Sequence, residues 1–390
     1  MRTAFLLPIV LCSMSSAATQ KLEIEVADFG ARMDGATDDT VAFQKALDAL
    51  PDRGVLKIPA GEAILSRTLV LKNKTAVIRG AGSGVTRLSW IDAGGLHLVE
   101  TRTWRESRAQ KASWDVRGIA FTTRVADGGT ALFADFKSSD RLDPAFAVQD
   151  CRFEGVGAEA CWTKSIWGHN AHIGRMVGCT FRGKATTEAH VHLTGNSTCF
   201  VIDSCHGMNS VYGVLVEGET EGVTISRCFF VHNRYGFVLN IAKGGEPMFN
   251  IMNSHASSGV YAVWIKNGRS SSLVGNCLIL SRCSKYKAGP KSREGIRIEG
   301  KQAKDIIVLA STIQITDKEF VDTFTGIRAL ACDGLILANN TVANNASTSD
   351  DNGIVIEKKV RQPTVSGNVF HLRSDREIVN RSTRSQKKGD

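Results

Sequence analysis

The sequence predicts an all-β protein built as a right-handed parallel β-helix, with an α-helix capping its N-terminal end. Three observations predict this class. A small residue recurs about once every 23 to 34 positions, a short strand motif lies between its copies, and one amphipathic helix lies near the start. A slot that is reused at one supersecondary period is the mark of a solenoid, in which each repeat packs against its neighbours.

The recurring small residue lies between apolar residues, as in Val148-Gln-Asp-Cys151-Arg-Phe153. A small residue that tolerates burial suits an inward position in a stack of coils. We expect the cysteines of this series to be thiols in a packed ladder. A disulfide such as Cys205–Cys228 stays open, because neighbouring coils lie roughly 4.8 Å apart. The whole series comprises Cys151, Cys179, Cys205, Cys228, Ser254, Cys277, Ser311, Asn340 and Asn368.

The strand motif reads small-apolar-x-apolar-x, and alternation with period two predicts short, half-buried strands. No helical period lies between its copies, which excludes alternating strands and helices. Tyr212, Tyr235 and Tyr261 align one residue before the motif, and we expect them to form a stacked aromatic column. The clearest copies are 213–217, 236–240, 262–266, 295–299 and 353–357.

The ends of the chain differ from the repeats. Residues 1–18 read as a secretory signal peptide, with Arg2 before an apolar run that is too short to span a bilayer. A single β-helix domain is expected over 19–372, with a cap helix at about 38–50 that begins at Asp38 or Asp39. Residues 373–390 form a polar, basic tail. We therefore expect a secreted or periplasmic protein.

The charge balance indicates the class of partner. The formal net charge is +9 and the pI is about 9.1, so an exported protein of this kind suits anionic partners. No nucleic-acid-binding motif occurs, and only 7% of the residues are aromatic, which disfavours stacking on single strands. We expect an acidic polysaccharide as partner, with no nucleic acid and no membrane span.

The N-terminal segment carries a recognisable motif: Asp28-Phe-Gly-Ala31, then Asp34-Gly, Asp38-Asp-Thr before a helix, and a strand ending Pro59-Ala-Gly61. This stretch resembles the pectate-lyase superfamily of single-stranded β-helices. Its members include polygalacturonases, polysaccharide lyases, uronan epimerases and phage tailspike depolymerases. The resemblance implies the fold but no particular reaction.

The motifs of the polygalacturonase mechanism are absent or incomplete. The sequence has no Asn-Thr-Asp. Cys205-His206-Gly207 matches the Gly-His-Gly motif only in part, and Arg297-Ile298-Glu299 matches the Arg-Ile-Lys motif only in part. We therefore do not carry that hydrolase mechanism over to this chain.

Alternation along the strand motif places every second residue outward, which gives two outward columns. The first column is predicted to run Trp162, His192, Leu215, Val238, Trp264, Arg297, Arg328 and Val355. The second is predicted to run Lys164, Thr194, Glu217, Asn240, Lys266, Glu299, Leu330 and Glu357. Adjacent coils lie roughly 4.8 Å apart, so His192 and Glu217 are expected to be neighbours, as are Lys266 and Glu299.

This face holds the candidate site. Lysis or epimerisation of a uronate requires a cation that neutralises the C6 carboxylate and a base that removes the C5 proton. We assign catalysis to His192, Glu217, Lys266 and Arg297, and substrate binding to Trp162, Asn240, Trp264 and Glu299. Glu217 and Glu299 lie three coils apart, on the order of 14 Å, which exceeds the spacing of paired glycosidase carboxylates.

The leading hypothesis is an exported polysaccharide lyase that acts by β-elimination on a uronate-containing polysaccharide. A uronan epimerase or a glycoside hydrolase of the same fold is the alternative. A non-catalytic binding protein, or a tailspike-like protein that forms a trimer, is another class, so the oligomeric state stays open. The sequence contains no compact acidic cluster, so we predict no metal site. A requirement for Ca²⁺ would favour metal-assisted lysis, and no other cofactor is expected.

Overall fold

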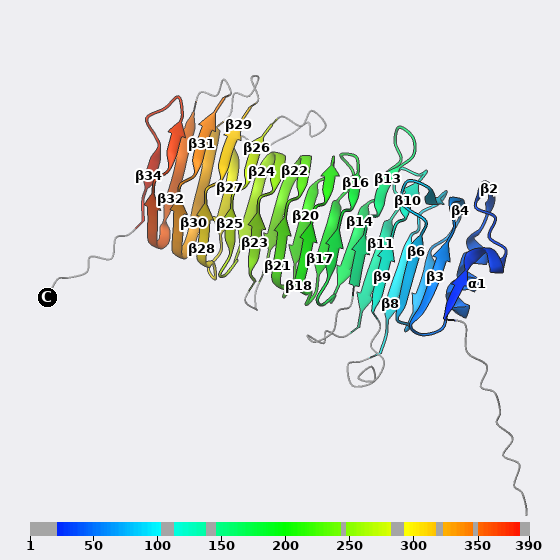
Figure 1. Cartoon of the computed structure of the whole chain (residues 1–390). Helices are drawn as coiled ribbons and strands as arrows, with labels where there is room; N and C mark the ends of the chain where they lie inside the picture. The colour runs from blue at the N-terminus through cyan, green and yellow to red at the C-terminus, as the bar shows by residue number, and fades with distance from the viewer. Residues whose placement is uncertain are drawn as a thin grey trace, which may run out of the picture.

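The computed structural model describes residues 22–102, 113–137, 146–242, 247–281, 292–316, 323–345 and 350–382. These residues form one elongated rod of strands (Figure 1). Every strand pairing among them is parallel and joins one coil to the next. For example, β17 (Ala189–Thr194) pairs with β14 (Lys164–His169) and with β20 (Tyr212–Glu217). The predicted parallel β-helix is therefore confirmed. The predicted signal peptide, 1–18, and residues 383–390 lie outside the described residues. Within the described ranges, no helix is long and apolar enough to cross a membrane.

The strands stack into three ladders, which we call faces 1, 2 and 3. Face 1 contains β5 (Leu69–Lys72), β8 (Leu96–Glu100), β11 (Thr130–Phe136), β14 (Lys164–His169), β17 (Ala189–Thr194), β20 (Tyr212–Glu217), β27 (Ser292–Glu299) and β34 (Ile378–Asn380). Face 2 contains β1 (Glu23–Glu25), β3 (Gly54–Ile58), β6 (Ala76–Gly80), β9 (Trp114–Arg117), β12 (Phe146–Gln149), β15 (Arg175–Val177), β18 (Thr198–Asp203), β21 (Glu221–Ser226), β23 (Phe249–Met252), β25 (Ser272–Val274) and β28 (Lys304–Leu309).

Face 3 contains β2 (Asp34–Asp38), β4 (Gly61–Leu65), β7 (Thr86–Trp90), β10 (Ala120–Thr123), β13 (Arg152–Gly155), β16 (Thr180–Arg182), β19 (His206–Met208), β26 (Cys277–Leu280), β29 (Thr312–Ile315), β31 (Thr341–Asn344) and β33 (Val369–His371). Four longer strands run through a corner. Strands β22 (Phe229–Asn240) and β24 (His255–Lys266) pass from face 3 to face 1, and β30 (Thr323–Ala338) and β32 (Asp351–Ser366) pass from face 1 to face 2.

The N-terminal cap consists of the 3-10 helix η1 (Val26–Phe29) and the helix α1 (Thr40–Ala49). The predicted cap helix is confirmed, and the two aspartates before it accept hydrogen bonds from different backbone amides. Asp38 accepts a hydrogen bond from the Thr40 amide at 3.0 Å, whereas Asp39 accepts from the amides of Arg32 and Met33 in the preceding turn. Phe43 and neighbouring apolar residues of α1 are buried over the open end of the coils.

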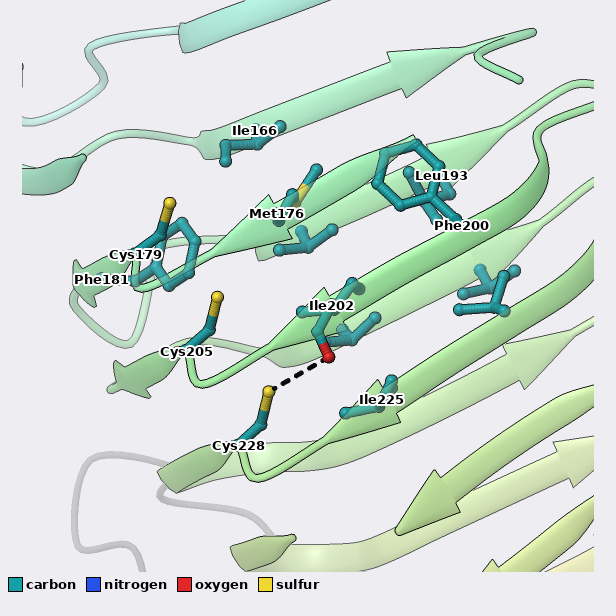
Figure 2. Packing of buried hydrophobic residues seen from close by; sticks show 14 of the residues in the cluster. Ile166, Met176, Cys179, Phe181, Leu193, Phe200, Ile202, Cys205, Ile225 and Cys228 are labelled. Atoms are coloured by element: carbon teal, nitrogen blue, oxygen red, sulfur yellow. Dashed lines mark hydrogen bonds between the residues drawn. The ribbon is translucent and has the colours of Figure 1, made fainter. Parts of the chain in front are cut away.

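The core is a continuous column of inward side chains. Phe121, Phe153 and Phe181 stack in successive coils, with ring centroids 5.0 and 5.3 Å apart. Figure 2 shows Cys179, Cys205 and Cys228 in the same inward column, with Cys228 Sγ donating to the Ile202 carbonyl at 3.5 Å. The described cysteines are free thiols. The predicted thiol ladder is confirmed at Cys151, Cys179, Cys205 and Cys228, which are all buried.

The ladder prediction was wrong by one residue at Cys277. Asn276 holds the inward position, whereas Cys277 begins β26 and pairs with His255 on the outer side of face 3. The ladder residue follows a residue with positive φ in each coil, and here that residue is Gly275, at φ 66°. The side chain of Asn276 accepts from the Ser254 amide at 3.0 Å and donates to the Ile251 carbonyl.

The β-helix extends beyond residue 372, the predicted C-terminal boundary of the domain. Strand β34 pairs in register with β32, with Ile378 opposite Ile354 and Val379 opposite Val355. The first part of the expected tail therefore adds another strand to face 1, because its apolar pair continues the columns of the preceding coil.

Candidate active site

The candidate site lies on the outer side of face 1, where β17, β20, β22, β24 and β27 follow one another along the rod (Figure 1). Seven of the eight predicted site residues are in the expected columns. The first column runs His192, Leu215, Val238, Trp264 and Arg297, and the second runs Glu217, Asn240, Lys266 and Glu299.

A histidine–glutamate pair forms the centre of this face. His192 Nε2 lies 2.9 Å from Glu217 Oε2, and Asn240 Nδ2 donates to Glu217 Oε1 at 2.9 Å. These two hydrogen bonds hold the pKa of Glu217 below its usual range, the bond with His192 having the larger effect. His192 is almost fully buried, whereas the Glu217 side chain is 36% exposed, so the glutamate is the solvent-accessible end of the pair.

The second ring nitrogen of His192 faces another carboxylate. Its Nδ1 is buried, lies 3.9 Å from Glu188 Oε1, and makes no hydrogen bond with a described residue. Glu188 is in turn held by Lys164 Nζ at 2.9 Å. The imidazole therefore lies between two carboxylates, an arrangement that favours proton transfer through the ring.

An aromatic platform borders the pair. Although Ala189, Leu215 and Val238 point outward, they are buried beneath Tyr212, Tyr235 and Trp264. The predicted tyrosine column is confirmed. The rings of Tyr212 and Tyr235 stack with their centroids 5.1 Å apart, and the ring centroids of Tyr235 and Tyr261 lie 5.6 Å apart. Burial raises the pKa of Tyr212 and of Tyr261, so both phenols stay protonated at neutral pH.

An ionic network closes the C-terminal end of this platform. Arg297 donates to Glu299 at 2.8 Å and to the buried Glu294 at 3.1 Å, and Arg328 Nε lies 2.6 Å from Glu294. Trp264 Nε1 donates to Glu299 at 2.9 Å. The charge of Arg297 is thus already balanced, and burial raises the pKa of Glu294 despite its two arginine partners.

Lys266 lies between Asn240 and Glu299 in the second column. Its backbone carbonyl accepts a hydrogen bond from the Ile241 amide, but its ammonium group makes no hydrogen bond or ion pair with a described residue. Of the two cations assigned to substrate neutralisation, Lys266 is therefore the better suited, because binding a uronate carboxylate would not first require breaking an existing pair.

The assignment of Trp162 to the outward column was wrong. Trp162 is 2% exposed, and its Nε1 donates to the Phe121 carbonyl inside the core. The outward positions of this coil belong to Trp167 and His169 instead, which pair with His192 and Thr194. Gly168 occupies the inward position at which the strand motif has an apolar residue, so this strand does not match the motif in the sequence. The predicted place of Lys164 in the second column is wrong for the same reason.

Sequence reasoning did not assign Glu188, Glu294 or Tyr212 to the site. Tyr212 is predicted from the sequence as part of a stacked aromatic column rather than as a ligand contact, although its alignment beside the outward columns could have indicated it. Glu294 lies opposite Tyr261, one residue before the motif in the next coil, so the same alignment could have indicated it. Glu188 lies outside the strand motif, and no periodic signal identifies it. In the described part of the chain, no group of three or more His, Cys, Asp or Glu residues is arranged to hold a metal ion.

Comparison with known proteins agrees with this fold. Residues 24–128 match the family of rhamnogalacturonase A/epimerase, pectate lyase-like proteins, and residues 124–279 match the right-handed β-helix region. Both matches support the right-handed parallel β-helix seen in the structure.

Individual relatives are enzymes of polysaccharides. Mannuronan C5-epimerase AlgE3 of Azotobacter vinelandii is 38% identical over 226 residues, which is 55% of this chain and 11% of that protein. Probable rhamnogalacturonase A of Aspergillus oryzae is 26% identical over 196 residues, which is 43% of this chain and 41% of that protein. The chain thus aligns with well under half the length of each of these relatives.

A solved structure supports the fold along nearly the whole chain. The A-module of mannuronan C-5 epimerase AlgE6 of Azotobacter vinelandii superposes with a TM-score of 0.57 and 16% identity, covering 90% of this chain and all of that module. At this identity the likeness concerns the fold alone.

Proposed function

We propose that this protein acts on a uronate-containing polysaccharide and inverts the configuration at C5 of a uronate residue. The observation that carries the proposal is the His192–Glu217 pair beside the protonated phenol of Tyr212. The same outward face carries Lys266, whose ammonium group has no partner among the described residues. The similarity to a mannuronan C5-epimerase supports the same reaction class.

Each step is assigned to a group on this face. Lys266 binds the C6 carboxylate and stabilises the negative charge that develops on it as the C5–H bond breaks. Glu217 accepts the C5 proton, and His192 behind it shares that proton through the 2.9 Å contact. The Tyr212 hydroxyl then donates its proton to the opposite side of C5, and solvent restores both groups. The tyrosine–tryptophan platform supports the sugar rings.

Lysis is the second candidate, because it shares the first half of this reaction. After C5 loses its proton, the C4–O bond breaks, a C4=C5 double bond forms, and the departing oxygen takes up a proton. The similarity to alginate lyase 7 of Azotobacter vinelandii, which is 38% identical over 80 residues, supports lysis as the second candidate.

The test is incubation of the purified protein with polymannuronate, polygalacturonate and a neutral glucan in D₂O. Deuterium incorporation at C5 with a changed uronate composition, read by NMR, supports epimerisation. Absorbance of unsaturated uronates supports lysis, whereas new reducing ends alone indicate a hydrolase. No change in any polymer would contradict both proposed reactions.

A further inference from the structure

A second surface, on face 3, carries a cavity of about 410 Å³ that the reaction above does not use. It lies over β13, β16, β19 and the start of β22, around the middle of the rod (Figure 1). Its walls include Arg152, Glu154, Arg182, His206 and Phe229. We call this cavity the face 3 groove, and its volume is in the range of small-ligand sites.

The aromatic part of the groove is unusual for an outward column. Phe229 is 47% exposed although it is a large apolar residue. The rings of His206 and Phe229 stack at 5.1 Å, nearly parallel, and His255 follows at 6.0 Å from Phe229. An exposed, flat column that nothing in the described structure covers is suited to the apolar face of a sugar ring.

The charge of the groove indicates which sugar fits. Arg152 and Arg182 line the cavity from adjacent coils, and Glu154 is the one carboxylate among the described residues of its lining. Arg152 is only weakly engaged, 3.9 Å from Glu154, and among the described residues Arg182 forms no ion pair. An arginine fork binds a carboxylate through two parallel hydrogen bonds. The groove therefore combines a stacking platform with cationic groups that suit a carboxylated ring.

We propose that the face 3 groove is a second, non-catalytic binding site for a uronate segment of an acidic polysaccharide, separate from the site on face 1. The inference rests on the proposed function for its ligand class, since it takes the same uronates as probe. It assigns the Arg182 guanidinium to the sugar carboxylate and the Phe229 ring to the sugar face. Such a site would retain the polymer while face 1 acts on another segment.

The test measures binding of hexameric mannuronate and galacturonate to the full chain by titration calorimetry, with maltohexaose as the uncharged control. Arg182→Ala and Phe229→Ala are each expected to weaken uronate binding at this site roughly tenfold or more. Arg175→Ala, at an exposed residue on face 2, removes the same charge. Val369→Ala, at a residue that is 50% exposed in the same outward column as Phe229, removes a smaller apolar surface outside the groove.

The outcomes separate this inference from the proposed function. A tenfold loss in Arg182→Ala and Phe229→Ala but not in the two controls, with turnover of the hexamer unchanged, supports the groove. The same loss in a protein that alters no uronan would support the groove and contradict the catalytic proposal. Equal affinity in groove and control variants, or no uronate binding by the wild type, would overturn the groove assignment whatever the activity.

Discussion

Nε2 of His192 lies 2.9 Å from Oε2 of Glu217, although the two residues are separated by a full coil of the chain. Parallel stacking produces this contact, because the register places His192 opposite Leu215 and Glu217 two residues further along the same strand. The histidine is buried and the glutamate is partly exposed. The pair therefore has one protected end and one end that can meet a substrate.

Replacing Glu217 with Gln should abolish most of the activity. The amide keeps the shape of the side chain but cannot accept a proton, so the rate should fall by about 10²- to 10⁴-fold. Glu219→Gln, an exposed residue in the following turn, is the matched control with the same change of charge. Deuterium exchange at C5 measures both variants, and equal rates would remove Glu217 from the mechanism.

The same residue should contribute to the acid stability of the fold. The pKa of Glu217 is lower in the folded protein than its ordinary value of 4.5, mainly through the hydrogen bond with His192. Its stabilising contribution is therefore complete above pH 4.5 and is lost as the pH falls through the lowered folded pKa. Thermal unfolding between pH 3 and 7 should show a shallower acid decline for Glu217→Gln than for the wild type. Parallel declines would indicate that the pair has no such role.

Removing the hydroxyl of Tyr212 separates its proposed acid role from its packing role. Tyr212→Phe keeps the ring stacked on Tyr235 but removes the proton donor, so epimerisation should slow by about 10²-fold or more with little change in the unfolding temperature. Tyr261→Phe is the matched change further along the column and should retain activity. Activity of Tyr212→Phe close to the wild type would assign this residue to packing alone.

Lys266 should be required for turnover through its charge. Lys266→Ala is expected to reduce the rate by about 10²- to 10³-fold, as for loss of a group that stabilises a developing anion. Lys266→Arg restores the charge with a different geometry and should recover part of the rate. Steady-state kinetics on polymannuronate compares the two, and a fully active alanine variant would contradict the assignment.

The fold and much of face 1 could be predicted because the coils repeat. A column defined by alternation transfers from one coil to the next, which is why His192 and Glu217 were expected as neighbours. The prediction failed where a local feature broke the pattern. Gly168 concealed the strand that carries Trp167, and an extra cysteine after Asn276 resembled the ladder residue. The ladder pattern places Phe229 and Arg182 on the outer side of face 3, but it does not show that their side chains line one groove.

Trp162 provides the sharpest contrast between the sequence prediction and the structure. Its ring packs against Trp90, with centroids 5.6 Å apart, and its indole N–H is satisfied by the Phe121 carbonyl. Trp162→Ala should therefore leave a cavity and remove the indole hydrogen bond to the Phe121 carbonyl, and it should lower the free energy of unfolding by about 3–5 kcal/mol. Trp264→Ala, on the partly exposed platform, should cost less stability but should weaken substrate binding. Denaturant unfolding and uronate titration of both variants give the comparison. A stable Trp162→Ala protein with impaired uronate binding would return Trp162 to the outer face, because only a surface residue can lose binding without loss of packing.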